Sequence, residues 1–196
     1  MSLTIGVVMG SVRPNRFNEK AALWISEILK KRENVVLVTI DPRDFDLPLY
    51  HESSSPSMVK DGAYPNPVAQ KLAVVIKSCD AFVIVAAEYN HSVTGVLKNL
   101  LDHVYAEWNN KAVGFVGYGS VGGARAVEQL RNIAAELQMA SVRTAVHIPA
   151  PWSLVDESNT LKAGALDSFV RTAEGMIDQL ISWGTALKSA RSVEKQ

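Results

Sequence analysis

Residues 3–29 read LTIGVVMGSVRPNRFNEKAALWISEIL, and this stretch decides the fold. Residues 3–9 are mostly apolar at consecutive positions, which is typical of a strand that is covered on both faces. From Phe17 onward the apolar residues recur every three or four positions, which predicts an amphipathic helix. A polar turn, residues 10–16, joins the two. The stretch therefore predicts the strand–turn–helix unit from which parallel sheets are built.

The rest of the chain repeats this alternation. Further apolar runs predict strands at residues 35–40, 81–87, 112–118 and 141–148. Helical periodicity predicts helices at residues 17–29, 67–78, 93–105, 127–137 and 166–181. Strands that alternate with helices require right-handed crossovers and a parallel sheet. Five strands and five helices match a doubly wound, flavodoxin-like α/β fold with the strand order 2-1-3-4-5.

Length and composition predict one domain. The chain has 196 residues, of which 47% are hydrophobic, so it can bury a full core without disulfides. We expect a single domain over residues 1–187, followed by a polar tail over residues 188–196. Residues 41–66 contain prolines and serines without periodicity and predict a long loop. Such a loop either covers a site or joins an interface.

Charge and cysteine content indicate which partners and compartment to expect. Basic and acidic residues balance at 20 each and are scattered, so we expect neither a nucleic-acid nor a membrane partner. Cys79 is the only cysteine, which suits a buried, inert thiol and a reducing compartment. The first residues lack a signal peptide, and no apolar run approaches the roughly 20 residues that span a bilayer. We therefore expect a cytoplasmic protein, and we expect no metal site.

The turn after the first strand has the groups that bind a phosphate. Gly10 permits a tight turn, and the start of the next helix offers free amides and a positive dipole end. Side-chain donors gather around it: Ser11, Arg13, Asn15, Arg16 and Asn18. We expect Arg16 to be an exposed loop residue that contacts the anion. The alternative is an ordinary turn with a helix cap.

The turn lacks two well-known nucleotide motifs. It is neither Gly-x-Gly-x-x-Gly nor the Walker pattern, which disfavours a dinucleotide-binding fold and a P-loop ATPase. Asp41, at the end of the second predicted strand, has the place of a ribose-binding acid. Because Pro42 follows it, Asp41 is more typical of the first residue of a turn.

Two further turns follow predicted strands and belong to the same edge of the sheet. Residues 88–92 read EYNHS, and residues 117–123 read GYGSVGG. In flavodoxin-like folds FMN binds at the switch point between strands one and three. Tyr89 suits contact with a flavin ring, and glycines let backbone amides approach a ring closely. The alternatives are a helix cap made by Asn90 or Ser92 and an ordinary glycine loop.

These motifs together resemble the NADPH-dependent FMN reductase family, which includes flavin-containing quinone reductases and azoreductases. The resemblance covers about residues 3–150. The matching motifs are Gly10-Ser11-x-Arg13-x-x-Arg16-x-Asn18, Glu88-Tyr89-Asn90-His91-Ser92-x-x-Gly95-x-Leu97-Lys98-Asn99-x-x-Asp102, Glu107-Trp108-x-x-Lys111 and Gly119-x-x-Gly122-Gly123. Two positions depart from the family, because Ala87 and Thr94 stand where proline is usual or frequent.

The resemblance implies a set of cofactor contacts. The first motif would hold the FMN phosphate, the second would line the isoalloxazine ring, and the glycine turn would complete the ring pocket. The implied cofactor-binding residues are Gly10, Ser11, Arg13, Arg16, Phe17, Asn18, Ala87, Glu88, Tyr89, Asn90, Tyr118, Gly119, Ser120 and Gly123.

The resemblance also implies an activity. FMN would accept a hydride from NADPH or NADH and return two electrons to a quinone, an azo compound, free flavin or a similar small molecule, in a ping-pong cycle. Because hydride transfer needs positioning more than an acid or a base, we expect no catalytic side chain. His91 is either a proton donor to product or a structural or solvent-facing residue. Arg125 and Arg143 are candidates for binding the extra phosphate that distinguishes NADPH from NADH.

The resemblance has consequences for assembly, and the residues leave alternatives to an enzyme. The resemblance implies a homodimer or a dimer of dimers, in which the helix at residues 93–105 packs against its mate. Tyr105 and Trp108 would then border the partner's flavin or be buried in their own subunit. The alternatives to an enzyme are a non-enzymatic electron carrier, a redox-responsive flavin protein, and a flavodoxin-like domain that binds another phosphorylated ligand or none. Carriers tend to have strong net charge, which this chain lacks.

Overall fold

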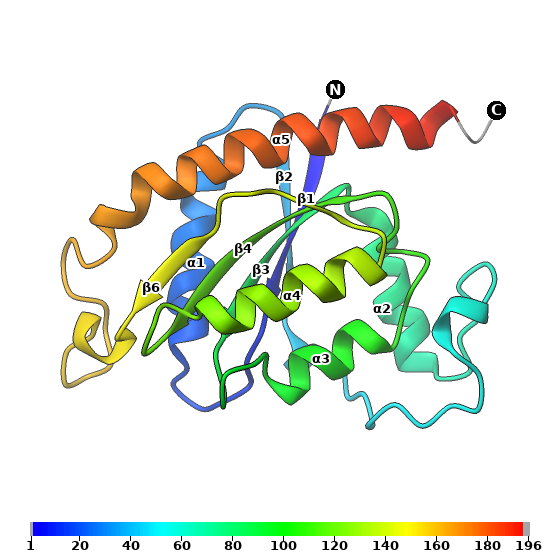
Figure 1. The fold of residues 1–196 in the computed structure, drawn as a ribbon, viewed down its shortest axis with the longest axis horizontal. Coiled ribbons are helices and arrows are strands. Elements are labelled where there is room, and N and C mark those ends of the chain that lie inside the picture. The colour runs from blue at the N-terminus through cyan, green and yellow to red at the C-terminus, as the bar shows by residue number, and fades with distance from the viewer. Residues whose placement is uncertain (1, 194–196) are drawn as a thin grey trace.

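A parallel sheet with helices on both faces forms the centre of the molecule, whose computed structural model describes residues 2–193 (Figure 1). The strands are β1 (Leu3–Met9), β2 (Val35–Ile40), β3 (Ala81–Ala87), β4 (Ala112–Gly119), β5 (Ala140–Ser141) and β6 (Val146–Pro149). The α-helices are α1 (Phe17–Lys30), α2 (Pro67–Ser78), α3 (Gly95–Asp102), α4 (Ala124–Glu136) and α5 (Val170–Val193). Four short 3₁₀ helices are η1 (Pro42–Asp44), η2 (Pro56–Met58), η3 (Pro151–Leu154) and η4 (Asp167–Phe169).

The strand order confirms the predicted flavodoxin-like fold. The sheet runs β2-β1-β3-β4-β5, β6 also pairs with β4, and the pairings are parallel. One predicted strand, residues 141–148, is in fact divided in two. β5 pairs with the beginning of β4 and β6 with its end. Between them, Arg131 of α4 donates to the carbonyls of Val142 and Arg143 at 2.7 Å each, so a side chain replaces the missing ladder partners.

The core has one layer on each face of the sheet. Val83 and Val85 of β3 pack with α1 and α5, whereas Phe82 and Ile84 pack with α2, α3 and α4. Figure 1 shows α3 and α4 in front of the sheet and α1 behind it. Because both faces are covered, all seven residues of β3 are buried, as its continuous apolar sequence predicts.

Helix α3 starts two residues later than the periodicity predicts. Thr94 caps it, because its hydroxyl accepts from the amide of Leu97 at 3.2 Å. The same hydroxyl donates to the carbonyl of Gly10 at 2.6 Å. The cap is therefore Thr94 and not Asn90 or Ser92. It ties the start of α3 to the turn after β1.

Helix α5 extends further than the sequence predicts. Residues 188–193, which were expected in a polar tail, form its last turns. The ammonium of Lys188 donates to Asp80 at 2.7 Å and to the carbonyl of Ser2 at 2.8 Å, and Arg191 donates to Asp80 at 3.2 Å. These contacts dock the polar end of the helix on the sheet. The remainder of the predicted tail, residues 194–196, lies outside the described residues.

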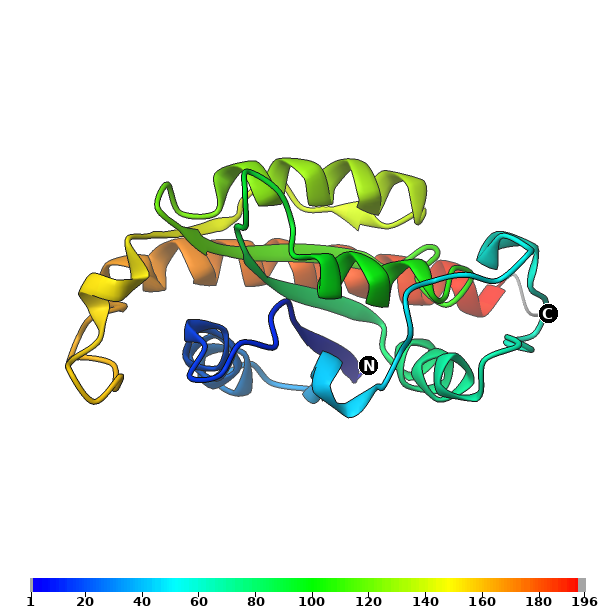
Figure 2. The same ribbon diagram turned by 90° about the horizontal axis from the view of Figure 1, so that it is seen from below.

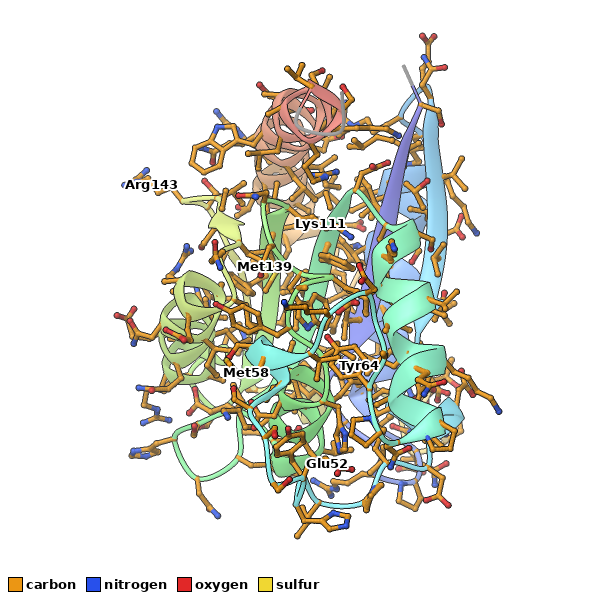
Figure 3. The ribbon with its side chains drawn as sticks, turned by 90° about the vertical axis from the view of Figure 1, so that its right-hand side faces the viewer. Glu52, Met58, Tyr64, Lys111, Met139 and Arg143 are labelled. Atoms are coloured by element: carbon orange, nitrogen blue, oxygen red, sulfur yellow. The ribbon has the colours of Figure 1, made fainter. Side chains whose placement is uncertain are left out.

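The long loop at residues 41–66 is fastened to α3 and to the segment after it. Asn99 accepts from the amide of Tyr50 at 3.0 Å, and Asn99 and His103 contact the carbonyl of Pro48 at 2.8 and 2.9 Å. Near the end of the loop, the buried hydroxyl of Tyr64 donates to Glu107 at 2.6 Å. Figure 3 shows Tyr64 pointing into the molecule.

Three single residues complete the comparison with the sequence. Cys79 is buried, as expected, and burial raises the pKa of its thiol. Trp108 is buried within its own subunit, where its ring lies 4.8 Å from that of Phe82. It therefore does not border a partner's site. Within residues 2–193, no helix has the length and apolarity needed to cross a membrane.

Candidate cofactor site

A cavity of about 280 Å³ opens at the carboxyl edge of the sheet, between the turn after β1 and the segment after β6. Figure 2 shows the dark blue turn and the yellow to orange segment on the same side of the molecule. The lining residues are Ser11, Arg13, Pro14, Asn15, Arg16, Phe17, Tyr89, Tyr118, Pro151, Trp152, Val155 and Asn159.

The cavity brings together six of the fourteen residues implied by the motifs: Ser11, Arg13, Arg16, Phe17, Tyr89 and Tyr118. The other eight do not line it: Gly10, Asn18, Ala87, Glu88, Asn90, Gly119, Ser120 and Gly123. They lie in or beside the three turns, where some brace the backbone. The predicted set therefore mixes residues that line the cavity with residues that lie behind or beside it.

The amino end of α1 faces this cavity and has no side-chain cap. Arg16 occupies the N-cap position, and within residues 2–193 its side chain makes no cap bond to the first-turn amides. Such amides have no partner within the helix and attract anions. Ser11, beside them, accepts from the amide of Arg13 at 3.4 Å and lies 3.3 Å from the hydroxyl of Tyr89. The turn therefore offers several donors to one anionic group.

Arg16 is buried, which contradicts the expectation of an exposed loop arginine. It is 4% exposed and donates to both carboxylate oxygens of Asp41 and to the carbonyl of Ser11. Asp41 also accepts from the amide of Arg43 at 3.0 Å and starts η1, so the turn interpretation of Asp41 is confirmed. The Nε of Arg16 is buried and has no partner among the described residues. An orphaned donor in the wall of the cavity fits an anionic ligand such as a phosphate.

Asn18 braces the turn from below. Its side chain is fully buried, accepts from the amide of Gly10 at 3.2 Å and donates to the carbonyl of Val85 at 2.8 Å. Gly10 itself leaves no room for a side chain, because a Cβ would lie 2.6 Å from the carbonyl oxygen of Val85. Asn18 and Gly10 thus fix the turn against β3, and neither reaches into the cavity.

The turn after β3 has a fixed backbone. Tyr89 and Ser92 exchange two backbone hydrogen bonds of 3.0 Å, and Asn90 and His91 between them have φ values of 48° and 68°. Both central side chains are exposed. His91 therefore lies at the surface of the turn, as the solvent-facing alternative predicts.

Glu88 faces away from the cavity. Its carboxylate accepts from the Nε of Arg125 at 2.7 Å and from the backbone amide of Arg125 at 3.1 Å, at the start of α4. Burial opposes ionisation of Glu88, but the bonds from Arg125 outweigh it and lower its pKa. Arg125 is thus held by an internal carboxylate. Arg143, the other candidate for a second phosphate, points outward at the edge of the molecule (Figure 3).

Aromatic side chains form the apolar part of the cavity. The rings of Phe17 and Tyr118 lie 5.3 Å apart, and the guanidinium of Arg13 lies 6.0 Å from the ring centre of Tyr89. Tyr118 is 8% exposed, and burial raises its pKa to about 12, so its phenol is neutral at pH 7. Gly123, whose φ is 68°, permits the turn over Tyr118, because a Cβ would lie 2.5 Å from the amide of Tyr118.

The motifs missed one side of the cavity. Pro151, Trp152, Val155 and Asn159 follow β6, at and beyond the end of the family resemblance. The signal that indicates them is a tryptophan between prolines and serine directly after a strand, in the stretch IPAPWS. Within residues 2–193, no three acidic, histidine or cysteine side chains lie close enough together to hold a metal ion.

The buried ion pair between Arg16 and Asp41 predicts that the folded protein loses stability in acid. Burial opposes ionisation of Asp41, but bonds from Arg16 and Arg43 lower its pKa from 3.8 to about 2. Because the folded pKa is the lower one, the stabilisation is present above pH 4 and is lost as the pH falls from 4 to 2. Urea unfolding should show a loss of about 2 kcal/mol over that range.

Asp41→Asn should lack this part of the pH dependence and should be about 3 kcal/mol less stable at pH 7, because Arg16 loses its counter-charge. Asp46→Asn is the control, since Asp46 is an exposed acid on the same loop. If the free energy of unfolding falls equally with pH in the wild type and in Asp41→Asn, the assignment of this acid sensitivity to Asp41 is wrong.

Comparisons with known proteins identify the family. The family model described as NADPH-dependent FMN reductase matches residues 3–153. An NAD(P)H-dependent FMN reductase of Schizosaccharomyces pombe is 36% identical over 144 residues, which cover 74% of this chain and 70% of that protein. A quinone reductase of Pseudomonas putida is 29% identical over 188 residues, which cover 92% of this chain and 94% of that protein.

Solved structures share the fold. FerB, a flavoenzyme NAD(P)H:(acceptor) oxidoreductase from Paracoccus denitrificans, superposes with a TM-score of 0.70 at 21% identity, covering 94% of this chain and 98% of that one. A flavodoxin from Pseudomonas aeruginosa superposes with a TM-score of 0.54 at 16% identity, covering 95% of this chain and 99% of that one. The chain belongs to the NADPH-dependent FMN reductase family, and its predicted class, an FMN-containing oxidoreductase that depends on NAD(P)H, is confirmed.

Proposed function

We propose that this chain binds FMN in the cavity at the carboxyl edge of its sheet and uses it to pass electrons from NADPH or NADH to quinones, azo compounds, free flavin or similar small acceptors. The observation that carries the proposal is the uncapped amino end of α1, which faces the cavity beside a buried, unpartnered Nε of Arg16. The names of the relatives, FMN reductase and quinone reductase, support the same assignment.

The phosphate of FMN would lie in the turn after β1. Ser11, the first-turn amides of α1 and the Nε of Arg16 offer neutral and charged donors, and Arg13 adds an exposed guanidinium at the cavity wall. Arg16 remains bonded to Asp41 and so contributes a fixed donor, whereas Arg13 contributes free charge. This division makes Arg13 the better residue with which to test the phosphate site.

The ring would lie against Tyr89 and Tyr118, with backbone groups of residues 88–91 and 118–123 at its polar edge. Bound FMN supplies the hydride acceptor and returns two electrons to the second substrate, which fits a ping-pong cycle. The neutral phenol of Tyr118 and the apolar wall would exclude water from the bound ring and orient it. No side chain in the cavity needs to accept a proton, so we assign no catalytic residue.

We further propose that residues 1–187 act as one FMN-binding domain, and that the chain works in the cytoplasm as a homodimer or a dimer of dimers. Helix α3 would pack against its mate. The family resemblance supports this assembly, and Lys98 is exposed on α3. The solution mass tests it, since the chain itself is 21.3 kDa.

Anaerobic reduction tests the activity. The flavin absorbance of FMN-loaded protein, at about 450 nm, should fall when NADPH or NADH is added, because the bound ring receives the hydride. Addition of a benzoquinone should then restore the yellow colour, and heat-treated protein serves as the control. Flavin that binds but is not bleached would favour the electron carrier or redox-responsive protein instead.

Arg13→Ala should weaken FMN binding about tenfold, because it removes a charged donor from the phosphate. The unfolding temperature should stay the same, since Arg13 is exposed. Titration of flavin fluorescence measures the affinity. Arg143→Ala is the matched control, because that arginine is exposed and does not line the cavity. Equal effects of the two substitutions would remove Arg13 from the site.

A further inference from the structure

The segment that follows β6 is fixed in an unusual conformation where it meets the cavity. Ala150 has φ 45° and ψ 55°, a left-handed conformation that is unfavourable for a non-glycine residue. Its amide donates to the carbonyl of Gly119 at 2.9 Å, and its carbonyl accepts from the amide and hydroxyl of Ser153 at 2.9 and 2.8 Å. Strain that the surroundings hold in this way is typical of ligand sites.

The strained residue places a tryptophan at the cavity. Trp152 lies on η3, lines the cavity and is 65% exposed, whereas Tyr118 on the inner side is 8% exposed. Pro151 and Val155 flank it on the same wall. An indole that is mostly uncovered loses the hydrophobic stabilisation that its large surface offers. A flat molecule that fills the cavity would cover it.

The far end of the segment is hydrogen-bonded to the turn after β1, which lines the same cavity. The side-chain amide of Asn159 donates to the carbonyl of Asn15 at 2.9 Å. Its turn is built by Asp156, which accepts from the amide of Thr160 at 2.9 Å and from the hydroxyl of Ser158 at 2.7 Å. The segment is thus a short ordered unit that is joined to β4 at one end and to the turn after β1 at the other.

We propose that residues 150–161 form an outer wall of the FMN site, in which Trp152 packs against the bound FMN. The hydrogen bond between Asn159 and Asn15 holds this wall to the turn after β1. This inference rests on the proposed function, because the cavity that holds the phosphate at Ser11 and Arg13 is the one that Trp152 lines. A molecule that fills this cavity from the turn after β1 to its opposite wall must contact the indole of Trp152.

Substitution of Trp152 tests the contact. Trp152→Ala should weaken FMN binding about tenfold, and Trp152→Phe should restore most of the affinity, because stacking on an aromatic ring contributes to binding whichever ring supplies it. The exposed position means that neither change should alter the unfolding temperature. Equilibrium dialysis with FMN gives the affinity without any enzymatic turnover.

Tryptophan fluorescence gives an independent readout. FMN should quench the wild type, and Trp152→Phe should show a clearly smaller quenched amplitude. Trp183→Phe is the matched control, since Trp183 is a partly exposed tryptophan on α5 that does not line the cavity, and it should keep the wild-type amplitude. An unchanged amplitude in Trp152→Phe would overturn the contact even if Trp152→Ala fails to fold.

The hydrogen bond is tested separately. Asn159→Ala should speed the dissociation of FMN several-fold in stopped flow, whereas Glu157→Gln, a change at an exposed position of the same turn, should not. If Trp152→Ala and Asn159→Ala bind and release FMN as the wild type does, the proposed wall is wrong, while the proposed FMN site still stands. If the unmodified chain does not bind FMN, the proposed function fails and the wall fails with it.

Discussion

The buried ion pair between Arg16 and Asp41 is the constraint on which the site depends. It joins the start of α1 to the end of β2, and through the carbonyl of Ser11 it fixes the turn between β1 and α1. Breaking such a pair leaves a buried charge and costs about 3–5 kcal/mol. Asn18 adds the contact to β3, and Thr94 adds the contact to α3. The turn is therefore held by neighbours on three sides, so its open amides face the cavity without needing a ligand to order them.

The charged residues of the site divide into two groups. Arg16 and Arg125 are bonded to the internal carboxylates of Asp41 and Glu88, and they position backbone at the ends of β1 and β3. Arg13 is exposed and free to meet a ligand's charge. A bound phosphate thus meets backbone amides and donors that are already oriented, which reduces the ordering cost of binding. The apolar side of the cavity, with Tyr118 and Trp152, supplies surface for a flat ring.

The sequence predicts the centre of the sheet well because β1, β3 and β4 are covered on both faces, so their apolar runs are continuous and easy to recognise. It does not predict the break between β5 and β6, since that depends on Arg131 bonding two carbonyls from another element. It also does not show that Arg16 is buried, because the partner, Asp41, lies 25 positions away in sequence. The position of Asn159 beside the turn after β1 escapes for a similar reason: its bond to Asn15 spans 144 positions, and no local pattern carries that information.

The central claim is that the turn after β1 holds a phosphate, and the comparison of FMN with riboflavin tests it most directly. The two ligands share the ring and ribityl chain and differ only in the phosphate. Charge-assisted bonds at this turn predict that FMN binds at least about a hundredfold more tightly than riboflavin. Equal affinities of the wild-type protein for the two ligands, measured in the same buffer, would show that the turn does not bind the phosphate and would contradict the account.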